Sequence, residues 1–182
     1  MQDPAIAEVW QTAFGKEFGG LAQGDNKTKT RGTDAIFVMT HNDIQRLKGK
    51  IFTYAQVVMD FRPQKEDPNR IRITAGGDKI QYDGELSVRT ADITTAKLHW
   101  NGVISTEDAR YMCLDISLFY LTAHLEYYEY MKMPLHLFPQ WIIDQYDLNK
   151  HAINGMVHIK MRKAVYGLPQ AGILATNDYD AN

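Results

Sequence analysis

The fold is decided by residues 156–172, which read MVHIKMRKAVYGLPQAG. Val157, Ile159 and Met161 alternate with polar side chains, and a two-residue period of this kind predicts a strand with one buried face. A Gly-Leu-Pro turn is expected to end this strand, because glycine and proline favour tight turns. A helix over residues 171–175 is expected to follow the turn.

The same reasoning predicts the remaining elements. Helical spacing of apolar residues predicts helices, whereas runs of β-branched and aromatic residues predict strands. Helices are expected over residues 5–18, 92–104, 138–148 and 171–175, and a Thr40–Asp43 capping box opens a short one. Strands are expected over residues 36–39, 51–61, 70–74, 111–117, 128–133 and 156–165. These elements predict an α+β fold in which an antiparallel sheet carries helices on one side.

Three details of this prediction concern segments outside the sheet. In the helix over residues 92–104, the apolar side chains Ile93, Ala96, Trp100 and Val103 are expected to face the core. The stretch over residues 19–32 is rich in Gly, Asn, Lys and Thr and is expected to be a mobile loop. The strand over residues 70–74 is expected to end at a hairpin-type turn made by Gly76-Gly77-Asp78.

Composition places the chain among ordinary globular proteins. It has 182 residues, of which 45% are hydrophobic and 23% charged, so one domain with a real core is expected. The single cysteine, Cys113, excludes a disulfide within the chain and argues against a Cys-based zinc site. No apolar stretch is long enough to span a membrane and no signal sequence is recognisable, so an intracellular location in the cytoplasm or nucleus is expected.

Charge is unevenly distributed along the chain. The net charge is −2, but residues 43–79 carry eight basic and five acidic side chains. A second basic group, Lys160, Arg162 and Lys163, leads directly into the Gly-Leu-Pro turn. Charge alone fits a phosphate-binding surface and the solvated faces of a neutral protein equally well.

One acid lies in an otherwise apolar segment. Residues 113–121 read CLDISLFYL and place Asp115 among strand-forming side chains. A buried carboxylate is costly unless it is hydrogen-bonded, paired or bound to a metal. Asp115 is therefore either a structural hydrogen-bonding group or a metal ligand.

Residues 113–121 and 166–172, in this order, resemble the first two polymerase motifs of reverse transcriptases from long-terminal-repeat retrotransposons of the copia and gypsy types. Tyr130-Met-Lys-Met-Pro134 resembles a segment of copia-like elements, and Val57-Val-Met-Asp-Phe-Arg-Pro63 resembles the fingers strand of the family. The resemblance spans roughly residues 51–175.

This resemblance implies part of the fingers and palm of a right-hand polymerase. The implied regions are an N-terminal helix and mobile loop over 1–33, a fingers-like region over 34–110 and a partial palm over 111–182. The complete enzyme would be an RNA-directed DNA polymerase, a nucleotidyltransferase that uses two magnesium ions. Its partners would be an RNA or DNA template with primer, deoxynucleotides and the remainder of the element's polyprotein, without a membrane.

The resemblance also assigns roles to individual residues. Asp115 and the carbonyl of Ile116 would hold magnesium, with Asp115 catalytic. Tyr120 would exclude a ribose 2′-hydroxyl, and Gln170 and Gln56 would border the nucleotide. The residues that would contact nucleic acid are Arg62, Lys65, Arg70, Arg72, Lys160, Arg162, Lys163, Gly167, Pro169 and Gly172.

The chain also departs from the family pattern. Gln56 stands where relatives place a basic residue, and Ser117-Leu118 follows the Asp-hydrophobe pair where polar residues are usual. No Asp-Asp dipeptide occurs, and Asp178 and Asp180 do not reproduce one. Since two cations need more than one carboxylate, the chain is expected to be truncated before the Asp-Asp motif and inactive by itself.

A second interpretation stays open. The chain is then a non-catalytic α+β module that binds nucleic acid weakly, or the relic of a degenerate element. Tyr127, Tyr128 and Tyr130 could stack on bases, as aromatic side chains do in single-strand binders, or could simply pack along a half-buried strand.

Overall fold

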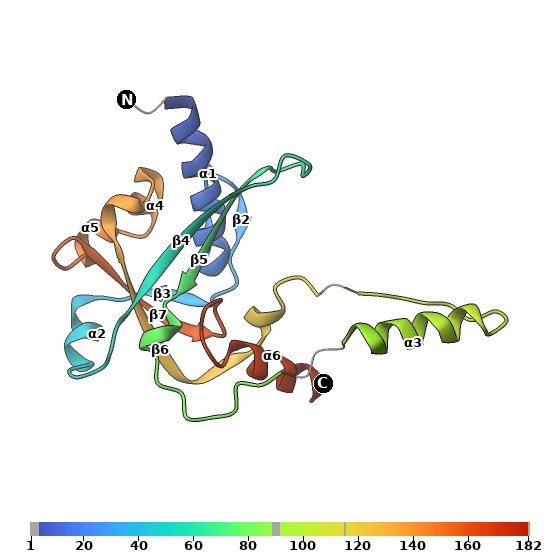
Figure 1. The fold of residues 1–182 in the computed structure, drawn as a ribbon. Helices are drawn as coiled ribbons and strands as arrows, with labels where there is room; N and C mark the ends of the chain where they lie inside the picture. The colour runs from blue at the N-terminus through green and yellow to red at the C-terminus, as the bar shows by residue number, and fades with distance from the viewer. Residues whose placement is uncertain (1–3, 89–91, 115, 182) are drawn as a thin grey trace.

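The structure is a computed structural model that describes residues 4–88, 92–114 and 116–181 (Figure 1). Within these residues it is a mixed α+β fold built on a curled five-stranded sheet, with a small two-stranded sheet and several helices. The predicted α+β class is therefore confirmed.

The large sheet places the last two strands of the chain between earlier ones. Across the sheet the order is β3 (Ile36–Val38), β7 (Met156–Lys163), β6 (His124–Pro134), β4 (Thr53–Phe61) and β5 (Asn69–Ala75). Among these described strands, β4 and β6 pair in parallel, and the other neighbours are antiparallel. The prediction of an antiparallel sheet is wrong at this pair, because alternation within a strand does not encode the direction of its neighbour.

One face of the sheet is the core. Val157, Ile159 and Met161 of β7 are fully buried, as their alternation predicts, and Met131 and Met133 of β6 join them. The buried cluster also takes residues from all three predicted regions of the chain. The regions over 1–33, 34–110 and 111–182 therefore share one hydrophobic core.

Helix α1 (Pro4–Leu21) packs against β5 and extends the helix predicted over 5–18. Its fully buried Phe18 meets Phe138 edge-on, with ring centroids 5.1 Å apart, and Tyr146 at 5.4 Å. Such pairs bury large apolar areas and fix the angle between the elements that carry them. Phe18 thus joins α1 to the segment that contains the short helices α4 and α5.

The segment predicted as one helix over 138–148 is two short helices, α4 (Gln140–Gln145) and α5 (Leu148–His151). They are separated at Asp147, which has a φ of 50°. A left-handed residue cannot continue a right-handed helix, and Asp tolerates this conformation better than most side chains. The apolar spacing that predicted a single helix does not report such a break.

The loop expected over residues 19–32 contains ordered pairing. Strands β1 (Gly24–Asp25) and β2 (Thr30–Arg31) form the small antiparallel sheet. Asp25 is buried, and its carboxylate accepts hydrogen bonds from the Thr28 hydroxyl at 2.6 Å and the Lys27 N–H at 2.9 Å. These bonds offset the cost of burying the acid and fix the turn between β1 and β2.

Two local predictions near the ends of strands have different outcomes. The Thr40–Asp43 capping box is confirmed, and it opens α2 (His41–Arg46). After β5 the chain forms a 3₁₀ turn, η1 (Gly77–Lys79), and no strand follows over the described residues 80–88. The hairpin-type turn expected there is wrong, because β5 pairs with the preceding strand β4.

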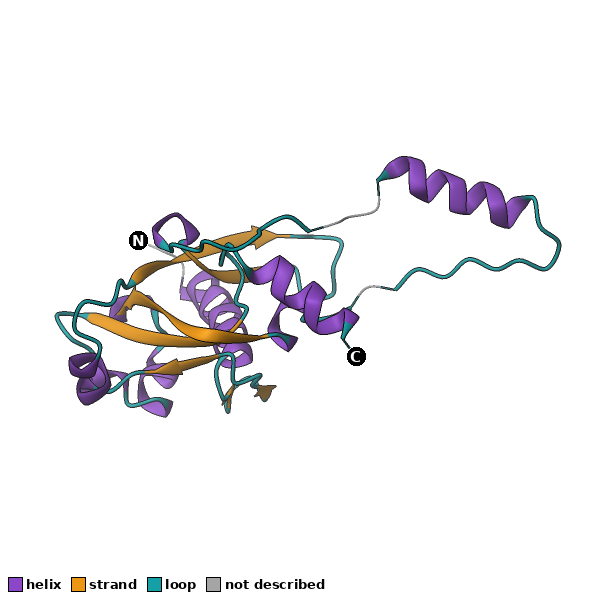
Figure 2. Ribbon diagram, turned by 90° about the horizontal axis from the view of Figure 1, so that it is seen from below, coloured by secondary structure: helices purple, strands orange, loops and turns teal. Residues whose placement is uncertain are grey.

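Helix α3 (Ile93–Ile104) projects away from the sheet (Figure 2). Asp92 caps it by accepting a 2.7 Å hydrogen bond from the Thr95 N–H, so the predicted helix is confirmed. The prediction that one side of this helix faces the core is wrong. None of its residues is buried, and Ile93 and Trp100 are 71% and 54% exposed. Residues 111–114, expected to begin a strand, are exposed and have no regular structure.

The chain ends in α6 (Ala171–Asp180), which begins where the sequence predicts a helix and runs longer. Short 3₁₀ turns, η2 (Phe119–Thr122) and η3 (Leu135–Leu137), precede and follow β6. In the part of the chain that the structure describes, no helix is both long and apolar enough to cross a membrane.

Glu17 links α1 to the edge of the sheet and gives stability a pH dependence. Its carboxylate accepts a 3.2 Å hydrogen bond from the Ile73 N–H. Burial raises the pKa of Glu17 above its ordinary value of 4.5, against the opposing effects of that bond and of Arg70 and Arg72. Because the folded pKa is the higher one, stability is greatest below the unfolded pKa and falls as pH rises through the folded pKa.

We therefore expect Glu17→Gln to be more stable than the native protein at pH 7, since the amide keeps an acceptor for Ile73 without a charge. The loss of stability on going from about pH 4.5 to neutral should shrink in the same variant. Urea unfolding at several pH values checks this, with Glu8→Gln as the control because Glu8 is exposed on the same helix. Parallel pH profiles for native protein and Glu17→Gln would contradict it.

Candidate nucleotide and nucleic-acid site

The turn over residues 166–170, called the Gly167 turn below, packs backbone against backbone on the end of β5. The Ala75 N–H donates a 2.8 Å hydrogen bond to the Tyr166 carbonyl. A Cβ on Gly167 would lie 2.1 Å from the Ala75 oxygen, and one on Gly77 would lie 2.3 Å from the Gly167 oxygen. Gly167 also has a φ of 92°. Glycine at 167 is therefore required both by conformation and by this close approach.

Gln170 lies at the end of this turn with little exposure. It is 4% exposed, and its Oε1 has no hydrogen-bond partner among the described residues. Burial raises the pKa of Glu129, while a hydrogen bond from the Gln170 side chain and the charge of Lys50 act in the opposite direction. An unpartnered buried oxygen is costly, so a ligand N–H or O–H that reached it would be bound favourably.

Tyr120 reaches the same turn from η2. Its ring meets that of Tyr166 edge-on, with centroids 5.4 Å apart and planes at 71°. Phe119 in turn contacts Tyr179 of α6, at 6.1 Å. The segment predicted to gate the sugar and the segment predicted to shape the nucleotide pocket thus come together, although 45 residues separate Tyr120 from Tyr166 in the sequence.

Gln56 lies close to this turn on β4. It pairs with Thr74, one position from the pair formed by Ala55 and Ala75. Its side chain is exposed, on the side of β4 and β5 opposite to the buried Ile71 and Ile73. The strand that carries Gln56 is therefore in contact with the Gly167 turn through the end of β5.

The structure does not place the predicted metal ligands at the Gly167 turn. Asp115 lies outside the described residues, and the neighbouring Ile116 is 42% exposed and belongs to no strand. Over residues 4–88, 92–114 and 116–181, no three His, Cys, Asp or Glu side chains gather where they could hold a metal ion.

Gly167, Pro169 and Gly172 lie at the turn and the start of α6, and the basic residues among the predicted nucleic-acid contacts are divided between two other places. Arg62 lies 3.6 Å from Asp60, Lys65 is exposed in the loop after β4, and Arg70 and Arg72 project from β5 on the side of Gln56. Their charge is partly balanced, because Arg70 and Arg72 also act on Glu17.

The second place is β7, where the three basic residues do not form one cluster. Lys163 donates a 2.7 Å hydrogen bond to the Thr33 carbonyl, which holds it to the loop before β3. Lys160 and Arg162 instead lie over aromatic rings. Lys160 Nζ is 5.1 Å from the centre of Tyr128, and Arg162 Cζ is 5.1 Å from the centre of Phe37.

Phe37 is a residue that the sequence reasoning missed. The available signal was the predicted strand itself, because successive residues of a strand point to opposite faces. With Ile36 buried, the half-buried Phe37 faces outward. Of the tyrosines considered for stacking, Tyr130 is only 8% exposed, whereas Tyr127 and Tyr128 are 76% and 45% exposed. Tyr130 therefore packs along the strand, whereas the rings of Tyr127 and Tyr128 are exposed, and their stacking on bases stays a prediction.

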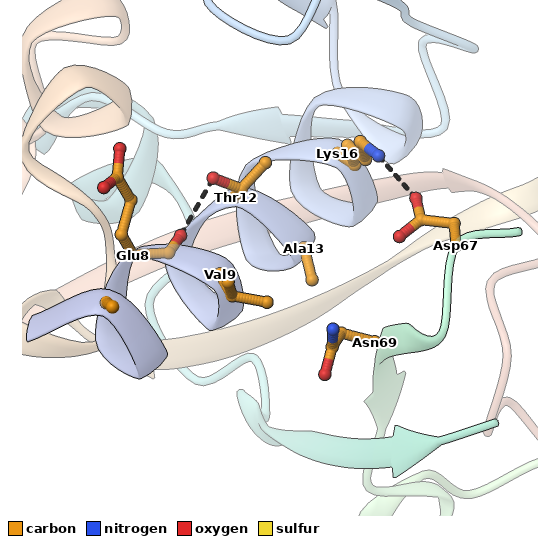
Figure 3. Close-up of a pocket in the computed structure, with 8 residues that line it drawn as sticks. Glu8, Val9, Thr12, Ala13, Lys16, Asp67 and Asn69 are labelled. Carbon is orange, nitrogen blue, oxygen red and sulfur yellow. Dashed lines mark hydrogen bonds and ion pairs between the residues drawn. The ribbon is translucent and has the colours of Figure 1, made fainter. Parts of the chain in front are cut away.

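Two hollows of the surface lie along α1, away from the Gly167 turn. One of about 450 Å³ lies between α1 and the start of β5, where Lys16 forms an ion pair with Asp67 (Figure 3). Another of about 530 Å³ is lined by apolar residues that include Trp10, Met59 and Leu137. Neither is lined by the predicted nucleotide-contacting residues Gln56, Tyr120 and Gln170.

Comparison with known proteins adds no relative: no family model, no curated protein and no solved structure matches the chain.

Proposed function

We propose that this chain is a fingers-and-palm piece of an RNA-directed DNA polymerase of the long-terminal-repeat retrotransposon type. The observation that carries the proposal is the convergence at the Gly167 turn. The turn holds the end of β5 through Ala75 and holds η2 through the ring of Tyr120. The sequence resemblance assigns the turn and the segment of Tyr120 to one nucleotide pocket, together with Gln56, which lies on β4 beside the end of β5.

The chemistry of these groups suits a deoxynucleotide. Gln170 offers a buried carbonyl oxygen that lacks a partner among the described residues, and the Tyr120 ring, which lies against Tyr166 of the same turn, would supply an apolar wall. Arg70 and Arg72, on the same side of the β4–β5 hairpin as Gln56, would contribute positive charge for phosphates. In this proposal the residues bind and orient a nucleotide.

The magnesium chemistry of the complete enzyme is not assigned to this chain. Two-metal nucleotidyl transfer needs several carboxylates around the reacting phosphate. The described residues do not supply such a set, and the chain has no Asp-Asp dipeptide. We therefore derive no catalytic step through magnesium.

The proposal is tested by photolabelling with a deoxyadenosine triphosphate that carries an azide on its base. We expect the label on peptides that contain residues 54–56, 119–122 or 166–172, because these segments surround the Gly167 turn. Gln170→Ala should reduce labelling, whereas Gln140→Ala should not, since Gln140 is an exposed amide on α4. Circular dichroism establishes that both variants are folded.

In the same preparation a primer on its template should not be extended with magnesium or manganese. Label spread over the surface, or unaffected by Gln170→Ala, would contradict the nucleotide site. Primer extension that Asp115→Ala abolishes would show that the chain is catalytically complete, against the expectation from its carboxylates.

The second candidate is a nucleic-acid-binding module without catalysis. It is favoured by the cations of β7 that lie over Phe37 and Tyr128. Nucleic-acid binding without labelling at the Gly167 turn would select this candidate.

A further inference from the structure

A group of cationic and aromatic side chains, separate from the Gly167 turn, lies on the face of the sheet opposite to the core. Strands β3, β7 and β6 lie side by side there (Figure 1). Phe37 pairs across from Lys160, which also pairs across from Tyr130. Because paired residues point to the same side of a sheet, Phe37 and Lys160 share the face opposite to the buried Ile159 and Met161.

Cations and rings are interleaved on this face. Lys160 Nζ is 5.8 Å from the centre of the Phe37 ring and 5.1 Å from that of Tyr128. Arg162 Cζ lies 5.1 Å from the centre of Phe37. These four residues, Phe37, Tyr128, Lys160 and Arg162, are called the cation–aromatic patch below.

The neighbours of the patch leave it accessible and positively charged. Tyr128 is 45% exposed, and the other three members are half-buried. Lys132 is exposed and pairs across from His158, which places it on the same face. Tyr130 is excluded from the patch because Phe52 lies against it, with ring centroids 5.5 Å apart.

Two acids near the patch do not cancel its charge. Hydrogen bonds from the Thr40 hydroxyl at 2.7 Å and the Thr40 N–H at 3.0 Å, together with the charge of Lys160, lower the pKa of Asp43, so this acid is ionised and offsets one of the three cations on the face. Glu129 pairs with Met161, whose side chain is in the core, so Glu129 belongs to the other side of the sheet. Lys160, Arg162 and Lys132 therefore present a net positive face.

We propose that the cation–aromatic patch binds single-stranded nucleic acid with little sequence preference. Aromatic rings on a sheet stack on bases, and the adjacent Lys and Arg contact phosphates. Only a single strand exposes base faces and phosphates together, because a duplex keeps its bases stacked inside. The two cations would move from the rings to phosphates as bases take their place, since cation–ring contacts at exposed sites are weak.

This proposal does not depend on the polymerase interpretation. Among the described side-chain contacts, those of the patch join β3, β6 and β7, whereas Tyr120 contacts Tyr166 at the Gly167 turn. An acidic peptide is the competing occupant, because it would use the cations and leave the rings without a role.

The test is fluorescence anisotropy with a labelled 20-nucleotide oligo-dT and with a 20-base-pair duplex, at several salt concentrations. We expect the native protein to prefer the single strand. Phe37→Leu with Tyr128→Leu should weaken that binding about tenfold or more, without changing its salt dependence, because each stacked base contributes about 1–3 kcal/mol. Lys160→Gln with Arg162→Gln should flatten the slope of log K against log salt by about 1.4.

A matched pair of variants separates the patch from general loss of charge. Tyr128→Leu with Lys160→Gln removes one ring and one cation from the patch, and Tyr82→Leu with Lys97→Gln does so at exposed positions elsewhere. Only the first pair should weaken binding. Tyr128→Leu alone serves if the Phe37 change unfolds the protein, which circular dichroism detects.

Three outcomes would overturn the proposal. The first is that the ring variants bind the single strand as tightly as the native protein. The second is equal affinity for single strand and duplex. The third is displacement of the single strand by poly-glutamate of equal charge, which would identify the surface as a site for acidic peptides. Loss of photolabelling at the Gly167 turn would leave the patch proposal standing, so the two proposals fail separately.

Discussion

Gly167→Ala is expected to destabilise the fold by about 3–5 kcal/mol, the combined cost of a strained positive φ and an overpacked contact. Gly167 has a φ of 92°, and an added Cβ would lie 2.1 Å from the Ala75 oxygen and 2.9 Å from its nitrogen. Backbone atoms cannot rotate away as the end of a side chain can. The substitution would therefore force the turn away from β5, and photolabelling there should be lost with it.

Gly49→Ala is the matched control for this prediction. Gly49 has a φ of 87°, close to that of Gly167, but an added Cβ at this position meets nothing within 4 Å. Its substitution should cost only the conformational strain, about 1 kcal/mol. Urea unfolding of the three proteins measures the difference. Equal costs for the two variants would mean that the turn is not packed against Ala75.

The second large effect is expected for Phe18→Ala. The side chain is fully buried and contacts Phe138 and Tyr146 edge-on, and it stacks with Phe14 at 6.3 Å. Removing a buried aromatic ring typically costs about 3–5 kcal/mol, because transfer energy is lost and a cavity stays behind. Such a loss is a large fraction of the stability of a typical domain.

Equilibrium urea unfolding measures this cost, and near-ultraviolet circular dichroism should report weaker aromatic packing. Phe61→Ala is the control, since Phe61 is 62% exposed near the end of β4 and its loss should change stability by less than about 0.5 kcal/mol. A cost below about 1 kcal/mol for Phe18→Ala would contradict the packing described for α1.

The elements that the sequence predicts well are those whose pattern is decided locally. Val157, Ile159 and Met161 alternate and are all fully buried in β7, and the Thr40–Asp43 capping box opens α2 as expected. Both patterns depend on neighbouring residues only. The break at Asp147 is also local, but it depends on a backbone angle that apolar spacing does not report.

Pairing and packing between distant segments were not predictable in this way. Nothing in the alternation of β4 states that it lies parallel to β6. The helix over 93–104 is confirmed, yet the apolar side chains that suggested an inner face are exposed, because a periodic pattern does not name the surface that covers it. The strand expected over 111–117 is absent from the described residues 111–114, because an apolar run forms a strand only where a partner strand and a core are available to it.

Part of the candidate site followed from sequence and part did not. The Gly-Leu-Pro turn was expected from its glycine and proline, and the structure has a turn there, whereas the packing of Gly167 against Ala75 was not foreseen. The grouping of Lys160, Arg162 and Lys163 was adjacency in sequence only, since Lys163 is held by Thr33. The Phe37 ring lies beside Lys160 and Arg162 because β3 pairs with β7, and this pairing is seen only in the assembled sheet.

The order of strands has a consequence for when the chain can fold. β3 and β4 are separated by 14 residues in the sequence, but β7 and β6 lie between them in the sheet. At about 5–20 residues per second, the ribosome adds these two strands several seconds after β4 has emerged. During that interval the edges of β3 and β4 that will later receive β7 and β6 have no partner strand. The nascent chain is therefore open to strand-by-strand association with other polypeptides until its last third has been made.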